Sequence, residues 1–126
     1  MSGPRPKSNW ITKFANAFRG VAVGIRGQNS FVVHIPMAVA VVTLALILNL
    51  ELHSICILLI CIGVVLSSEL FNSAIESLAK AVTEKEDPRI RDALDIASGA
   101  VLTVSAFAAI VGVLLLGTGL LQMFEN

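Results

Sequence analysis

Long runs of apolar residues alternate with short polar segments along the chain and predict its helices. Residues 31–50 and 97–121 are two such runs, and residues 54–81 begin as a third. About 20 apolar residues are enough for a helix to cross the hydrocarbon core of a bilayer, which is ~30 Å thick. The pattern predicts an all-α membrane protein with three transmembrane helices. A short turn at residues 51–53 would join the first two, and the charged segment Val82–Leu94 would join the last two. Within that segment Asp87-Pro88 is a good helix start, because Asp caps a helix and Pro fits its first position, so the third helix is expected to begin in water and enter the membrane near Asp95.

The segment before the first apolar run has an amphipathic pattern. Apolar residues recur at helical spacing within residues 10–27; they are Trp10, Phe14, Ala17, Phe18, Val21 and Ile25. Lys13, Asn16, Arg19 and Arg26 fall largely elsewhere on the same helix. This pattern is typical of a helix in the headgroup layer whose aromatic side chains face the acyl chains. A helix packed on other protein is the alternative.

Residues 1–9 are polar, and their glycine and prolines oppose helix formation, so we interpret them as a tail. Residues 10–126 then form one membrane-embedded domain. A chain of this length that consists mostly of spanning helices has little core of its own, and we therefore expect an oligomer.

Composition and charge agree with a membrane protein. Of the 126 residues, 56% are hydrophobic and 14% are charged, and the mean hydropathy is +0.84. A soluble domain carries roughly 25% charged residues. With a formal net charge of zero, this composition excludes a disordered chain, a nucleic-acid binder and an ordinary soluble enzyme.

The distribution of basic residues predicts the orientation of the helices. All nine Lys and Arg residues lie before the first span or within residues 80–92, and residues 51–53 and the segment after residue 121 have none. Short segments rich in Lys and Arg stay in the cytoplasm. We therefore expect a cytoplasmic N-terminus and a C-terminus on the other side of the membrane.

Common catalytic and metal-binding motifs are absent from the sequence. It contains no GxxxxGK[ST], GxGxxG, HExxH or GxSxG pattern. Cys56 and Cys61 stand five residues apart in one apolar run, so on a helix they point in different directions and are not expected to pair. Any nucleotide chemistry would need a site unlike those of soluble kinases.

Three polar residues interrupt the second span on one face. Glu69, Asn72 and Glu76 follow i, i+3, i+7 spacing and lie in the cytoplasmic half of the predicted helix. The third helix would bring Asp95 and Ser98 to the same membrane surface, and Gln28 directly precedes the first span. These groups are expected to meet at one depth near the inner surface.

A charged side chain in the apolar region costs about 2.5–3.5 kcal/mol on insertion scales, so an acidic residue there indicates a function. Glu69 lies deepest and is suited to accept a proton, while Glu76, nearer to water, could hold a divalent cation. The structural alternatives are an interhelical hydrogen bond for Glu69 or Asn72 and an ion pair between Glu76 and Lys80. His34 could relay protons, but a hydrogen bond near the interface is our preferred interpretation.

The stretch Glu69-Leu70-Phe71-Asn72-Ser73-Ala74-Ile75-Glu76 resembles the E-x-x-N-[ST]-A-[IL]-E signature of a family of small bacterial membrane lipid kinases, the prokaryotic diacylglycerol kinase and undecaprenol kinase family. Further matches are Phe14…Ala17…Gly20, Asn29…His34 and Asp95…Ser98-Gly99-Ala100-Val101. The resemblance covers nearly the whole chain after residue 10.

The resemblance implies transfer of the ATP γ-phosphate, with Mg²⁺, to diacylglycerol or undecaprenol at the cytoplasmic face of a bacterial inner membrane. It also implies a homotrimer with active sites between subunits. Glu69 matches the general base, and Glu69 and Ser98 match positions at the lipid. Glu76 matches a metal ligand, with Gln28 at the second metal position. The implied nucleotide site comprises Gln28, Asn72, Glu76, Lys85, Glu86, Asp87, Arg91 and Asp95. Phosphoryl transfer needs mainly positioned phosphates, a bridging cation and an acceptor for the hydroxyl proton.

Two positions depart from the family pattern. Gln28 stands where the family usually has a second metal-binding Glu; its carbonyl oxygen can still bind a cation, but one negative charge is lost. Leu94 stands where the family has a Lys that serves the phosphates, and Arg91, one turn earlier on the same face, is our candidate replacement. These departures keep open a non-catalytic relative that binds lipid or nucleotide or acts as a scaffold. A small ion or proton channel is a third alternative.

Overall fold

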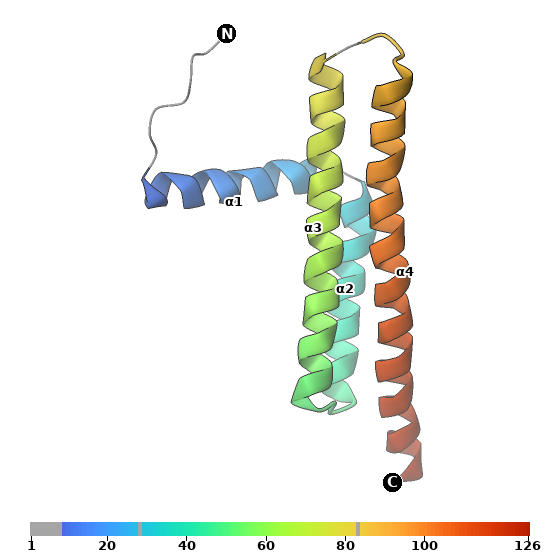
Figure 1. Cartoon of the computed structure of the whole chain (residues 1–126). Coiled ribbons are helices and arrows are strands. Elements are labelled where there is room, and N and C mark those ends of the chain that lie inside the picture. Colours follow the sequence, from blue (N-terminus) through green and yellow to red (C-terminus); the bar gives the residue numbers. More distant parts are fainter. Residues whose placement is uncertain (1–8, 28, 83) are drawn as a thin grey trace.

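The structure is a computed structural model that describes residues 9–27, 29–82 and 84–126. Its helices are α1 (Trp10–Arg26), α2 (Ser30–Ile47), α3 (Leu52–Val82) and α4 (Pro88–Glu125). Helices α2, α3 and α4 run side by side, and α1 lies across them (Figure 1). The connection between α3 and α4 is at the upper end of the bundle in this view, and the α2–α3 turn and the C-terminus are at the lower end.

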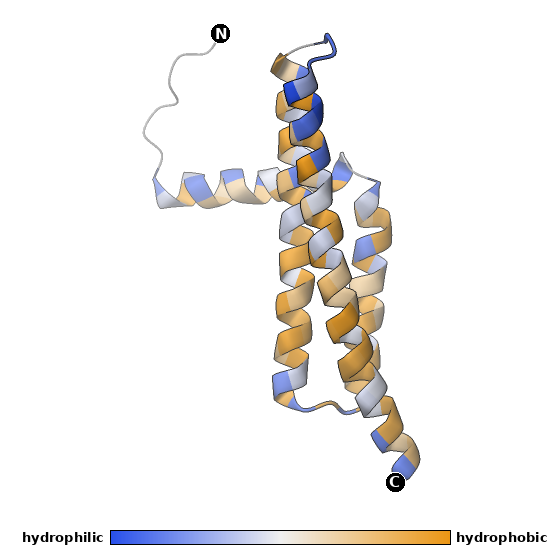
Figure 2. Ribbon diagram, turned by 45° about the vertical axis from the view of Figure 1, so that its right-hand side comes forward, coloured by the Kyte–Doolittle hydropathy of each residue, from blue (hydrophilic) through white to orange (hydrophobic). Residues whose placement is uncertain are grey.

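The three bundle helices are long and apolar enough to cross a membrane, which confirms the predicted all-α class with three spans. Figure 2 shows hydrophobic residues over most of the bundle and hydrophilic residues gathered at the α3–α4 connection. Few apolar side chains are buried within the described chain: Phe31, Ala45, Leu58, Val65 and Ala97. Most of the others face outward, as expected for a surface that contacts lipid or other subunits.

Helix α1 confirms the amphipathic helix expected at residues 10–27. Asn9, which we assigned to the tail, is its N-cap, because Asn9 Oδ1 accepts hydrogen bonds from the Thr12 amide (2.9 Å) and hydroxyl (2.8 Å). No residue of α1 is buried. The helix approaches α3 closely at Gly24, where an added Cβ would lie 2.5 Å from Leu70 Cδ2. A helix lying across the spans with exposed aromatic side chains fits the interfacial interpretation.

The turn between α2 and α3 lies earlier than predicted, at residues 48–51 and not at 51–53. Asn49 adopts the left-handed conformation (φ 58°), and the Leu50 and Asn49 amides donate to the carbonyls of Ala45 and Leu46 (both 3.1 Å). This is the Schellman arrangement, which ends a helix at a residue that tolerates positive φ. The expectation was wrong because hydropathy alone cannot show where a helix ends inside an apolar run.

The same turn packs on α4. A Cβ added to the buried Gly119 would collide with the side chain of Leu50, and it would lie 3.6 Å from Leu48 Cδ1. The missing side chain at Gly119 therefore allows the end of the α2–α3 hairpin to pack against the third span. This contact helps to set how α4 lies along the hairpin.

Helix α4 begins where the Asp87-Pro88 sequence predicts. Asp87 Oδ1 accepts a hydrogen bond from the Arg89 amide (2.8 Å), and Oδ2 pairs with the Arg89 guanidinium (3.0 Å). These bonds from Arg89 lower the pKa of the Asp87 carboxyl below its ordinary value. Because the folded-state pKa is lowered, the stabilisation is present at neutral pH and is lost only in acid, as the pH falls through that pKa.

The predicted charged segment Val82–Leu94 is mostly helix. Described residues 84–87 form the connection, and residues 88–94 are the first two turns of α4. The hydrophilic end of the bundle therefore consists of helical ends joined by a short link. Charge alone does not separate a loop from a solvated helix start.

Replacement of Asn49 tests the turn. Asn49→Val places a β-branched residue in the left-handed region, which costs about 1–2 kcal/mol, and should lower stability by that amount. Asn49→Gly keeps the conformation accessible and is the control. The measurement is equilibrium unfolding in detergent, and a Val variant as stable as the wild type would contradict the assigned turn.

Candidate active site

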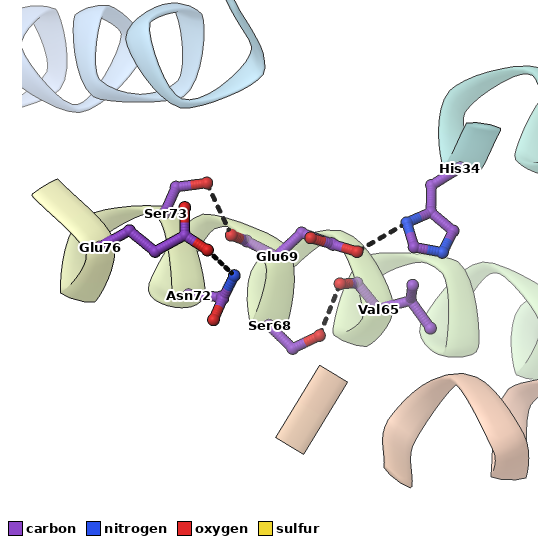
Figure 3. Close-up of polar contacts among 7 residues, drawn as sticks. All are labelled: His34, Val65, Ser68, Glu69, Asn72, Ser73 and Glu76. Carbon is purple, nitrogen blue, oxygen red and sulfur yellow. Dashed lines mark hydrogen bonds and ion pairs between the residues drawn. The ribbon is translucent and has the colours of Figure 1, made fainter. Parts of the chain in front are cut away.

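Glu69 is the most deeply placed acidic side chain of the described chain. It lies in α3 and is 2% exposed, and its Oε1 is 2.9 Å from Nδ1 of His34 on α2 (Figure 3). This contact joins Glu69 to a residue of another span and gives His34 an acidic neighbour. What the sequence did not show is that the two residues are each other's partner. The pair joins two spans through two titratable groups.

Asn72 and Glu76 form the next layer toward the hydrophilic end of α3. Asn72 Nδ2 donates a hydrogen bond to Glu76 Oε1 over 3.0 Å, one helical turn away. Among the described residues, no ion pair between Glu76 and Lys80 is present. The interhelical hydrogen bond considered for Asn72 is also not formed, since its amide donates within α3.

The side-chain carbonyl oxygen of Asn72 lacks a hydrogen-bond donor within the described residues. Asn72 is 7% exposed, and this Oδ1 atom is buried. A buried carbonyl oxygen with no donor costs about 1–3 kcal/mol, so its retention requires an explanation. A bound cation or a ligand donor would satisfy it. Asn72 Oδ1 and the Glu76 carboxylate are oxygen donors of the kind that Mg²⁺ prefers.

The serines beside these residues are satisfied by the helix itself. Ser73 Oγ donates to the Glu69 carbonyl (2.9 Å), and Ser68 Oγ donates to the Val65 carbonyl (2.7 Å). Such bonds back to the preceding turn bury a hydroxyl without a partner on another helix. Ser73 therefore leaves the Glu69 carboxylate free for other contacts.

Two grooves adjoin the cluster. One, of about 670 Å³, lies between α1 and α3; Gly20, Gly24 and the C-cap Gly27 line it on the α1 side, and Ser73, Glu76 and Lys80 line it from α3. The other, of about 730 Å³, lies among α2, α3 and α4, and is mostly apolar, with His34 and Ser105 among its lining residues. Residues on either side of Glu69 along α3 line the two grooves. Glu69 itself is in neither lining; its neighbours Ser67 and Leu70 line the first groove, and Leu66 lines the second.

The remaining predicted site residues are not gathered around this cluster by a single chain. Asp95 and Ser98 are exposed on α4, and within the described residues no hydrogen bond or ion pair joins them to α3. Arg91, Lys85 and Glu86 are also exposed, and Asp87 caps α4. Gln28 lies outside the described residues. In the part of the chain that the structure describes, no group of three or more His, Cys, Asp or Glu residues could hold a metal ion.

Comparison with known proteins identifies relatives over most of the chain. The family described as prokaryotic diacylglycerol kinase matches residues 15–116. An undecaprenol kinase of Bacillus subtilis (strain 168) is 31% identical over 108 residues, which cover 86% of this chain and 88% of that protein. A diacylglycerol kinase of Synechocystis sp. is 34% identical over 116 residues, covering 91% of this chain and 66% of the relative. No solved structure matches.

The family match begins inside α1, includes α2 and α3 complete, and ends within α4. It therefore contains His34, the whole stretch from Glu69 to Glu76, and Asp95. This chain belongs to the prokaryotic diacylglycerol kinase family.

Proposed function

We propose that this protein is an ATP-dependent lipid kinase that uses Glu69 as its general base. The observation that carries the proposal is the buried Glu69 carboxylate, within the family's signature stretch and beside His34, whose neighbours along α3 line a groove with polar groups and an apolar groove. Family membership and relatives named as lipid kinases support this function. No observation favours the non-catalytic alternative.

The chemistry follows from the position of Glu69. A carboxylate oxygen of Glu69 accepts the proton of the lipid hydroxyl, and the lipid oxygen forms a bond to the γ-phosphorus of ATP. The bond between that phosphorus and the β,γ-bridging oxygen breaks, and ADP leaves. The products are a phosphorylated lipid, ADP and a protonated Glu69, which returns its proton to water.

Glu76 and Asn72 suit the nucleotide end of the site. A Mg²⁺ ion held by these residues would supply positive charge to neutralise the phosphates. The Glu76 carboxylate and the unsatisfied Asn72 Oδ1 are the described groups that would hold it, and the Gln28 carbonyl oxygen is the further ligand we propose. We assign Lys85, Glu86, Asp87, Arg91 and Asp95 to the nucleotide.

We further propose a homotrimer whose active sites form between subunits. Asp95 and Ser98 are exposed on α4 in the single chain, and the bundle leaves most of its apolar surface uncovered. A neighbouring subunit could therefore supply the α4 residues that one chain does not bring to its own α3. The distribution of Lys and Arg supports a cytoplasmic N-terminus, and membership of a prokaryotic family supports a location in the bacterial inner membrane.

The lipid is an alcohol, and diacylglycerol and undecaprenol are the two candidates. Each presents one hydroxyl at the interface, and the two relatives are named for different lipids. Radiolabelled ATP offered with a panel of lipid alcohols, followed by chromatography of the products, would identify the substrate.

Replacement of Glu69 tests the role of the base. Glu69→Gln keeps the size of the side chain and removes the proton acceptor, so turnover should fall about 10²–10⁴-fold. The measurement is transfer of radiolabelled phosphate to lipid, with the oligomeric state in detergent as the control for assembly. Turnover equal to that of the wild type would refute the assigned role.

Replacement of Glu76 tests the proposed cation site. Glu76→Gln removes one negative charge from the ligand set, so half-maximal activity should require about tenfold more Mg²⁺. A magnesium titration of kinase activity measures this. Glu51→Gln, an exposed carboxylate at the opposite end of α3, is the matched control, and an unchanged requirement in Glu76→Gln would exclude Glu76 as a ligand.

Replacement of Arg91 tests whether it substitutes for the Lys that the family has where Leu94 stands. Arg91→Ala should raise the KM for ATP about tenfold, because a cation facing the phosphates would be lost. Arg19→Ala removes an exposed cation from α1 and should leave the KM for ATP unchanged. Equal ATP affinity and turnover in Arg91→Ala and the wild type would show that Arg91 does not compensate.

A further inference from the structure

We propose that His34 is the positioning residue of Glu69, holding one carboxylate oxygen so that the other faces the lipid hydroxyl. The inference rests on the proposed function, in which Glu69 is the general base. It adds to that function a residue from a second helix that controls the base without touching the reacting atoms.

The geometry around Nδ1 is the first observation. His34 Nδ1 lies 2.9 Å from Glu69 Oε1, and the two side chains are 26% and 3% exposed. Nδ1 itself is buried and makes no hydrogen bond of good geometry within the described residues. A buried ring nitrogen without any partner is costly, so the carboxylate is the group that compensates for its burial. Contacts of this kind in ligand-free enzymes are often poorly aligned and tighten when substrates bind.

The surroundings of Glu69 are the second observation. In the described part of the chain, the ion pair with His34 is the one polar contact of the Glu69 carboxylate; the Ser73 hydroxyl donates to the backbone carbonyl of Glu69 and not to its side chain. One carboxylate oxygen is therefore held and the other is left for a ligand. Without His34, the long side chain of Glu69 could rotate away from the position needed for proton transfer, and exact placement of a base has a large effect on rate.

The place of His34 in the fold is the third observation. His34 lines the apolar groove among α2, α3 and α4. Its ring lies beside the Glu69 carboxylate. A lipid chain in this groove would bring its hydroxyl toward the pair. Donation from Nδ1 to the carboxylate requires the ring tautomer that carries its proton on Nδ1, or the cation.

Nuclear magnetic resonance of the ring nitrogens tests the contact without any assay of activity. The chain has two histidines, and His53 is exposed at the far end of α3, so labelling with ¹⁵N-histidine gives two assignable rings. In Glu69→Ala, the ring nitrogen signals of His34 should move while those of His53 stay in place. If the His34 signals are the same in the wild type and in Glu69→Ala, the proposed pairing is wrong.

Kinetics test the positioning role. His34→Ala should lower kcat at least tenfold while leaving the KM for ATP unchanged, because the base is misplaced and the nucleotide site is not. His34→Asn should recover most of that loss, since its amide nitrogen can take the place of Nδ1 as a donor. His53→Ala is the matched control and should behave as the wild type. An Asn variant no better than the Ala variant, or a normal kcat in the Ala variant, would overturn the inference.

The two proposals fail in different ways. A wild-type protein that phosphorylates no lipid alcohol would remove the proposed function, while the resonance test of the contact would still stand. Loss of turnover in Glu69→Gln together with a normal kcat in His34→Ala would leave the kinase proposal intact and remove only the role of His34.

Discussion

The structure depends on keeping an acidic side chain inside a helix bundle that is otherwise apolar. A charge at such a depth costs several kcal/mol unless a partner compensates for the lost water. Here the compensation comes from another helix, since the Glu69 carboxylate meets His34 across the α2–α3 interface. The pair lies at the point where the bundle changes from apolar to polar, and the neighbouring buried residues Asn72 and Ser73 extend that polar region along α3.

The α2–α3 turn is what allows this meeting. Two antiparallel helices bring particular residues opposite each other only if the turn that joins them ends each helix at a definite position. Asn49 does this by adopting a positive φ and closing the Schellman hydrogen bonds. The turn also packs against Gly119 of α4. The turn at one end of the hairpin therefore sets the pairing of His34 with Glu69 near the other.

A single chain brings together only part of the set of candidate site residues. The α2–α3 interface supplies His34, Glu69, Asn72 and Glu76, whereas Asp95 and Ser98 face outward on α4. The same chain leaves most of its large apolar side chains exposed. The proposed trimer explains both the exposed α4 residues and the exposed apolar surface. A neighbouring subunit would cover apolar surface and bring its own polar α4 residues to the α3 helix of this chain. The unsatisfied Asn72 Oδ1 fits a site that is completed by a ligand.

The sequence by itself determined the number of spans, the amphipathic first helix, the start of α4 at Asp87-Pro88 and the shared face of Glu69, Asn72 and Glu76. These depend on local rules: hydropathy over about 20 residues, helical periodicity and capping. The family signature also contains Glu69, Asn72 and Glu76. The tertiary structure decided where α2 ends, that Glu76 accepts a hydrogen bond from Asn72, and that His34 faces Glu69. A contact between helices depends on their register and rotation, which no local pattern contains.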